Sequence, residues 1–227
     1  MANATMAAAI AGAMIAAGPP FALAAPAADE LATGKMLVDA CAGCHGTDGN
    51  SAGPAMPSIA AMDPLVFVDT MTAFAHDDTY STVMGRVARG YTQREYLLMG
   101  EYLHGIAYKP AAQAPDQTLV QKGAKLHERY CENCHEEGGK PIVEDEDYYI
   151  LAGQWTPYLK YAMSDFREHR RHLPRKMGRK LDDMLAAEGA GSLNALYAFY
   201  AAYADAERDN DNDNDNDNDN DNDNESE

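Results

Sequence analysis

Cysteine, tryptophan and basic residues are scarce in this chain of 227 residues. It contains four cysteines, one tryptophan and 18 Lys and Arg residues, against 36 Asp and Glu residues. The formal net charge of −18 does not suit a protein that binds phosphate backbones, so we expect no nucleic-acid partner. Sustained alternation of polar and apolar residues is also missing, and we therefore expect almost no β-sheet.

Long apolar segments are missing as well. The apolar run at residues 7–18 is too short to span a bilayer, and no later segment is apolar enough to do so. Ala-Leu-Ala at residues 22–24 offers a small-x-small cleavage site. We therefore predict that residues 1–24 are a signal peptide for export to the periplasm, although no Lys or Arg precedes the run. The mature protein is expected to have no membrane span.

Every cysteine belongs to one of two Cys-x-x-Cys-His motifs, which predict two covalently bound haem c groups. In this motif the thiols form thioether bonds to haem vinyl groups and the histidine binds the iron. A thioredoxin-like pair needs no histidine after its second cysteine, and the 86 residues between Cys44 and Cys131 are too many for a zinc ribbon. Disulfides between cysteines three apart would be strained. The motif residues are Cys41, Cys44 and His45, and Cys131, Cys134 and His135.

The two motifs mark an internal repeat. The haem histidines lie 90 residues apart, and further along the offset becomes 93, where Met84-Gly-Arg matches Met177-Gly-Arg. We therefore expect three additional residues in the loop after the second haem histidine. The repeat predicts a first domain at residues 29–107, a linker with two prolines at 108–115, and a second domain at 116–208.

Both domains are predicted to be helical. Amphipathic helices are expected at residues 29–41 and 116–131, where each leads to a haem motif. The pairs Asp63-Pro64 and Thr156-Pro157 are typical of an N-cap followed by proline in the first helical position. Thr92 and Glu95 form a capping box, and Ser192 is expected to cap the matching helix.

The C-terminal residues 209–227 differ from the rest. They consist of eight Asp-Asn pairs followed by Glu-Ser-Glu, with ten acids, no base and no apolar residue. Such a segment has nothing to bury, so we expect an acidic, disordered tail.

The sixth iron ligands are predicted to be methionines. At the offset of 93 only Met84 and Met177 coincide, and each precedes a glycine that would allow the backbone to approach a haem closely. An offset of 92 instead pairs Met71 with Met163, but Met163 has the spacing of an ordinary helix core. We therefore assign the first iron to His45 and Met84 and the second to His135 and Met177. The other five histidines are expected not to bind iron.

These residues resemble a known family. The run from Cys41 to Ser51 resembles the first haem motif of two-domain class I cytochromes c. Residues 123–141, together with Leu-Ala-Gly-Gln-Trp-Thr-Pro-Tyr at 151–158, are similar to the haem subunit of flavocytochrome c sulfide dehydrogenase. The similarity extends over about residues 29–204. It implies an all-α fold of two tandem class I cytochrome c domains, each built around one haem c.

The resemblance also implies a function and partners. Members of the family form a heterodimer with a larger FAD-binding flavoprotein subunit that oxidises sulfide, and they pass its electrons to a soluble acceptor such as a small cytochrome c. Both irons are then His/Met-ligated. This chain has no Gly-x-Gly-x-x-Gly fingerprint, so it would not oxidise sulfide alone.

Two other functions stay open. The chain could be a free, diffusible two-haem carrier to a terminal oxidase. It could also be a two-haem peroxidase, but that needs an iron with an exchangeable sixth position, and the symmetry of Met84 and Met177 disfavours it. An exposed apolar docking face would distinguish a permanent subunit from a free carrier.

Overall fold

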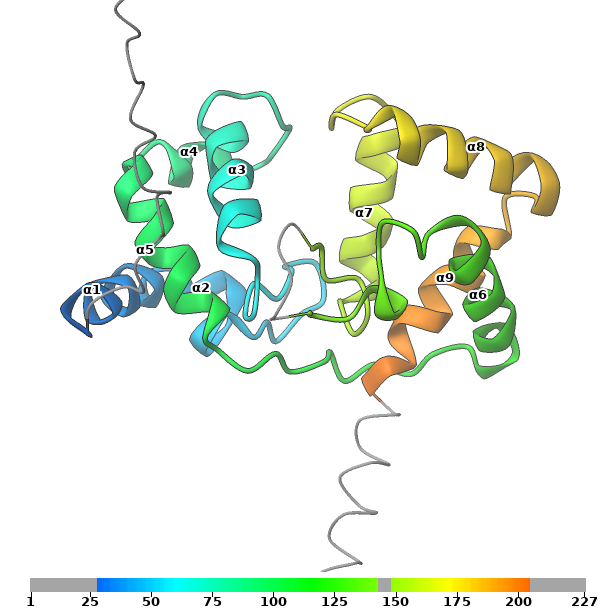
Figure 1. Ribbon diagram of the computed structural model, residues 1–227, viewed down its shortest axis with the longest axis horizontal. Coiled ribbons are helices and arrows are strands. Elements are labelled where there is room, and N and C mark those ends of the chain that lie inside the picture. Colours follow the sequence, from blue (N-terminus) through cyan, green and yellow to red (C-terminus); the bar gives the residue numbers. More distant parts are fainter. Residues whose placement is uncertain (1–27, 143–147, 205–227) are drawn as a thin grey trace, which may run out of the picture.

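The computed structural model describes residues 28–142 and 148–204, which form two groups of helices beside each other (Figure 1). Within these ranges there is no β-strand, which confirms the all-α prediction. No helix in the described part of the chain has the length and apolar character needed to cross a membrane. The expected signal peptide at residues 1–24 and the acidic tail at 209–227 lie outside the described residues.

The first group of helices precedes the linker. Its long helices α1, α3 and α5 pack together around a core that includes Val38, Phe67, Met99 and Leu103. Helix α5 begins with the predicted capping box: the Thr92 hydroxyl accepts from the Glu95 amide, and the Glu95 carboxylate accepts from the Thr92 amide at 2.6 Å. The elements are α1 Ala28–Asp39, α2 Ala42–His45, the 3-10 turn η1 Thr47–Gly49, α3 Pro64–Ala75, α4 Met84–Ala88 and α5 Gln93–His104.

The second group follows the linker and repeats this arrangement, but the helix that corresponds to α4 is longer. Its core includes Leu126, Leu181, Met184 and Leu196. The Asp116 side chain caps the first helix by accepting from the Thr118 amide at 3.1 Å. The elements are α6 Gln117–Tyr130, the 3-10 turn η2 Glu137–Gly139, α7 Thr156–Arg167, α8 Arg175–Glu188 and α9 Ser192–Ala201.

A glycine permits the closest helix crossing in each group. A Cβ atom added to Gly34 of α1 would lie 2.3 Å from the Leu98 carbonyl oxygen of α5. A Cβ added to Gly123 of α6 would lie 2.0 Å from the Ala195 carbonyl oxygen of α9. Real Cβ atoms do not come so close to backbone, so any larger residue would push the helices apart. The first and last helices of both groups therefore cross in the same way.

Two predicted helix starts need correction. Helix α7 begins at Thr156, so its N-cap is Trp155 rather than Thr156, and the tryptophan makes no capping side-chain bond. Pro64 is thus the first residue of α3 whereas Pro157 is the second of α7. Proline is tolerated at both positions because the first amides of a helix have no partner within it. Similarly, the N-cap of α9 is Gly191, and the Ser192 hydroxyl donates to the Gly189 carbonyl at 2.6 Å.

The three additional residues of the second half are divided between two loops. Equivalent backbone bonds join Ile59 to Gly49 and Leu151 to Gly139, so the offset grows from 90 to 92 in the loop after the haem histidine. It stays at 92 through α3 and α7 and the turns that follow them. The last additional residue lies between these turns and the two Met-Gly-Arg sequences. The expectation of three residues in one loop was therefore wrong.

The linker contacts both helix groups. Residues 108–115 form no helix or strand. The Asn50 side chain bonds the Ala107 carbonyl at 3.0 Å and the Lys109 amide at 2.7 Å. On the other side, Gln113 donates to the Gln154 carbonyl at 2.7 Å, and the Ala111 amide donates to the Gly153 carbonyl at the same distance. The connector is therefore extended, as predicted, and fastened at both ends.

Candidate haem sites

The first haem motif follows directly from α1. The Cys41 thiol is partly buried, Cys44 is exposed, and the short helix α2 brings His45 into the interior, where 7% of the residue is exposed. The His45 Nδ1 lies 2.8 Å from the Pro57 carbonyl oxygen and therefore donates to it. That bond leaves Nε2 with a lone pair. Burial lowers the pKa of His45, which favours the neutral ring that binds metals.

The second haem motif lies in a turn after α6. Cys131 is partly buried and Cys134 is exposed, as in the first motif. Burial, and to a smaller extent the nearby His127, lowers the pKa of His135. Unlike His45, the buried Nδ1 of His135 has no hydrogen-bond partner among the described residues. The lowered pKa favours the neutral form of both histidines, but only the His45 ring has its orientation fixed by a carbonyl.

The donor set of each motif fits a thioether-bound haem. None of the four cysteines forms a disulfide, so each motif presents two thiols beside a histidine, which is buried in the first motif and half-buried in the second. Burial raises the pKa of the Cys41 thiol and brings that of Cys131 to about 11, so these thiols are protonated at neutral pH. The described residues contain no cluster of three or more His, Cys, Asp or Glu side chains of the kind that would hold a separate metal ion.

The candidate sixth ligands are both partly buried. Met84 is the first residue of α4 and packs against the first core, while Met177 is the third residue of α8. Met71, from the competing alignment, is only 4% exposed within the first core, and Met163 packs against the second. Both therefore have the surroundings of core residues. The assignment of Met84 and Met177 to the irons stays a prediction.

A buried polar network lies behind the second motif, and sequence reasoning missed it. His127 of α6 is 2% exposed, and its Nδ1 lies 2.9 Å from the Tyr200 hydroxyl of α9. Its Nε2 lies 2.9 Å from the His135 carbonyl oxygen and 2.7 Å from a Glu132 carboxylate oxygen. Because both groups accept, Nε2 carries a proton, and the Tyr200 hydroxyl is the hydrogen-bond partner of Nδ1. The network fixes the backbone of the predicted iron ligand.

The remaining histidines have no such role. His76, His169 and His172 are exposed, and His104 is partly buried with its Nδ1 3.4 Å from the Tyr148 hydroxyl. Arg86 and Arg179, which follow the candidate methionines, are exposed.

The loops that follow the two haem histidines meet between the helix groups. The Gln154 side chain accepts from the Ser58 amide at 3.1 Å and donates to the Ser58 carbonyl at 2.7 Å. The Trp155 indole donates to the Ser51 carbonyl at 3.1 Å, and its ring lies where a Cβ on Gly53 would stand. The Tyr148 hydroxyl donates to the Ala61 carbonyl. Buried hydrogen bonds of this kind fix the two sites relative to each other.

Known proteins resemble this chain in sequence and fold. It is 39% identical over 102 residues to the cytochrome subunit of sulfide dehydrogenase of Chlorobaculum tepidum, a match that covers 42% of this chain and 92% of the relative. It is 28% identical over 164 residues to cytochrome c4 of Azotobacter vinelandii, which covers 63% of this chain and 75% of the relative. The fold matches reduced cytochrome c4 of Pseudomonas stutzeri with a TM-score of 0.61 and 21% identity, over 75% of this chain and 97% of that one. No protein-family model matches the chain.

Proposed function

This chain belongs to the family of the cytochrome subunits of sulfide dehydrogenase, and from this membership we propose that it carries electrons from a sulfide-oxidising flavoprotein to a soluble acceptor. It is a two-haem cytochrome c with two tandem class I domains and an electron-transfer protein. The flavoprotein partner, the acceptor and the location in the periplasm are the steps that we propose beyond this.

The chain's own residues would hold and orient the two haems. Bound haem supplies an iron that gains and loses one electron. The four motif cysteines would hold its edge, and His45 and His135 would bind the irons through Nε2. The Pro57 carbonyl fixes the ring of His45, and the His127 network fixes the backbone of His135. We propose that Met84 and Met177 would be the second protein ligands of the two irons, which would leave neither site open for substrate. The chain would then be no enzyme by itself.

The proposal depends on one combined observation. Both Cys-x-x-Cys-His motifs have side chains that suit a covalently bound haem, and the sequence matches a sulfide dehydrogenase subunit. Exposed apolar side chains support a permanent partner. Five of the seven large apolar residues that the described part leaves exposed lie in the first domain, and Tyr80 and Val83 are 53% and 50% exposed close to Met84. Such residues are what a stable subunit interface covers.

A second function, that of a free two-haem carrier, is favoured by the similarity to cytochrome c4. That similarity extends over more of this chain than the sulfide dehydrogenase match does.

The test is affinity purification of the tagged full-length chain from the periplasm of its host, followed by absorption spectra before and after sulfide is added. We expect an equimolar partner that contains FAD, and haem bands that become those of the reduced state when sulfide is added. Haems that dithionite reduces but sulfide does not, with no flavoprotein in the eluate, would contradict the proposal and identify the free carrier.

A further inference from the structure

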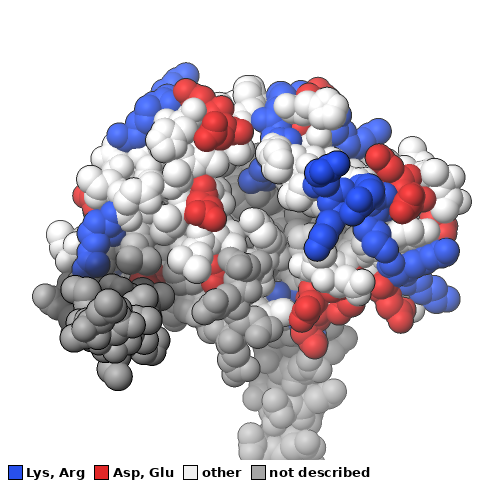
Figure 2. Space-filling model, turned by 45° about the horizontal axis from the view of Figure 1, so that its top comes forward, with Lys and Arg blue, Asp and Glu red and all other residues white. Residues whose placement is uncertain are grey.

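The second domain carries a concentrated group of basic side chains. Residues 167–180 contain seven of the chain's 18 Lys and Arg residues and one acid. The matching residues 74–87 of the first domain contain one Arg and two Asp. Figure 2 shows this blue group on the right of the molecule, the side on which Figure 1 places α7 and α8. We call its exposed members the basic face: Arg167, Arg175, Lys176, Arg179 and Lys180.

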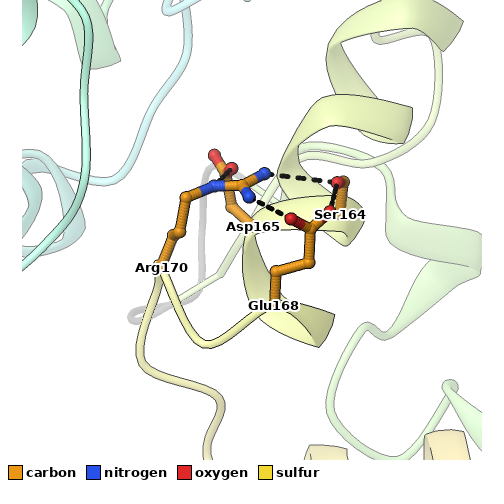
Figure 3. A network of polar contacts seen from close by, with 4 residues as sticks. All are labelled: Ser164, Asp165, Glu168 and Arg170. Carbon is orange, nitrogen blue, oxygen red and sulfur yellow. Dashed lines mark hydrogen bonds and ion pairs between the residues drawn. The ribbon is translucent and has the colours of Figure 1, made fainter.

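The other two bases of this stretch have internal partners. Arg170 bonds the side chains of Asp165 at 2.7 Å, Ser164 at 3.3 Å and Glu168 (Figure 3). The guanidinium of Arg171 lies 5.2 Å from the centre of the Phe166 ring. These contacts fix the loop between α7 and α8. By contrast, no residue of the basic face forms an ion pair with another side chain in the described ranges. Its charge is therefore available to a partner.

The basic face borders the second haem motif. Lys180 is close enough to Cys131 that its charge opposes the rise in the pKa of the thiol that burial causes. Helix α8 also carries Met177, with Leu181 and Met184 buried at helical spacing on the inner side. The same helix thus presents a candidate iron ligand inward and four bases outward. A partner bound to the basic face would lie close to the second haem motif.

We propose that the basic face is the docking surface of a soluble redox protein that has an acidic surface around its own cofactor. The inference rests on the proposed function for the direction of electron flow out of this chain. Each encounter would move one electron from the reduced second haem to the acceptor, which is reduced by one electron. Opposite charges accelerate such encounters by roughly 10- to 1,000-fold at low salt. An exposed, charged surface also releases its partner quickly, as a repeated transfer requires.

The chain's own acidic tail is the competing occupant of the basic face. Residues 209–227 carry ten acids and no base, so their charge also complements it. If the tail covers the basic face, an added polyanion should not bind there; if the face is free for an external acceptor, the polyanion should bind. The test therefore distinguishes these two occupants.

The test uses the full-length protein with both haems, reduced by dithionite and freed of excess reductant. Its oxidation is followed by stopped flow with two probes, hexacyanoferrate(III), which is anionic, and tris(1,10-phenanthroline)cobalt(III), which is cationic. The variant is Arg175→Glu/Lys176→Glu/Arg179→Glu. The control is Lys122→Glu/Lys125→Glu/Arg129→Glu, which changes charge equally on exposed positions of α6. Poly-L-glutamate stands in for an acidic protein surface.

At low salt we expect the variant to react about ten-fold more slowly with hexacyanoferrate and faster with the cobalt complex. The control should change both rates less than two-fold, and salt should remove the differences. Poly-L-glutamate should slow the oxidation of the unchanged protein by hexacyanoferrate but not that of the variant. Equal effects in variant and control would overturn the proposal, because net charge alone would then explain them.

A second result would overturn the docking proposal and indicate that the acidic tail occupies the basic face. If poly-L-glutamate protects only a chain that ends at Arg208, the tail already occupies the basic face. Neither probe needs a flavoprotein or sulfide. Failure of this experiment therefore leaves the proposed function standing, and failure of the purification experiment leaves the docking surface standing.

Discussion

The two domains use the same helix crossing but fill the space behind their haem motifs differently. Val38 and His127 each lie four residues after the glycine of the crossing, and both are buried. Leu103 and Tyr200 correspond as well, because each accepts a backbone hydrogen bond from the loop that follows its haem motif, from Ala61 and Gly153, respectively, at 2.8 Å. The first domain thus has an apolar pair where the second has a hydrogen-bonded His–Tyr pair.

This difference shows how one fold can place two identical haem-binding motifs in unequal surroundings. Hydrogen bonds and burial around a haem ligand tune its reduction potential. In the first domain a carbonyl orients the histidine ring, whereas in the second a buried network holds the histidine backbone. The second domain also presents the basic face, which the first lacks.

The largest loss of stability is expected at the helix crossings, which the two domains share. Gly34→Ala and Gly123→Ala should each lower the free energy of unfolding of their own domain by about 3 kcal/mol, because the added methyl group meets a backbone carbonyl. Guanidinium unfolding of the holoprotein, followed by circular dichroism and haem absorption, measures this. Gly191→Ala is the control, since a Cβ there meets nothing within 4 Å. Equal stability of all three variants would mean that the helices do not cross at these glycines.

The candidate methionines provide the next largest effect. Met84→Ala and Met177→Ala should each lower the potential of their own haem by on the order of 100 mV, or about 2.3 kcal/mol per electron. Each should also let carbon monoxide bind the iron that has lost its ligand. Spectroelectrochemical titration resolves the two haems. Met71→Ala and Met163→Ala are the matched controls, and spectra in which only these change would transfer the assignment to the competing pair.

The buried pair of His127 and Tyr200 can be replaced by Val and Leu, the residues at the matching positions of the first domain. His127→Val alone should cost about 2 kcal/mol of unfolding free energy, because it removes the buried hydrogen bonds of the His127 ring with the Tyr200 hydroxyl and the His135 carbonyl. The double variant His127→Val/Tyr200→Leu should lose about 1 kcal/mol less unfolding free energy than the sum of the losses of His127→Val and Tyr200→Leu. Denaturant unfolding checks this, and His76→Val, at an exposed position, is the control. A fully additive double variant would show that the two side chains act independently.

The smallest effect concerns the helix caps. Asp63→Ala should cost about 1 kcal/mol, because the Asp63 carboxylate accepts from the Val66 amide at 2.8 Å. Thr156→Ala, which the sequence presents as its counterpart, should cost less than about 0.5 kcal/mol, since Thr156 lies inside α7. Asp69→Ala is the control on the exposed side of α3. Thermal unfolding ranks the three, and an equal loss for Thr156→Ala would restore it as the cap.

Local chemistry was predictable from the sequence, and long-range packing was not. The motif cysteines and histidines follow from adjacent residues, and the capping box at Thr92 follows from residues three apart. The offset of 92 between α3 and α7 was hidden because Pro64 and Pro157 align at 93 although they occupy different positions in the first turn. The contact of His127 with Tyr200 spans 73 residues and depends on how two helices cross. No short pattern in the sequence encodes it.

The bonds between the two haem loops have a consequence for the order of folding. They join Ser58 to Gln154, Ala61 to Tyr148 and Ser51 to Trp155, across 96, 87 and 104 residues of chain. Contacts between residues so far apart in sequence close late and slowly. The Ser58 backbone of the first domain therefore stays without its Gln154 partner until the loops of the two domains meet. Docking of the two helix groups onto each other is therefore a separate folding step, slower than the formation of either group.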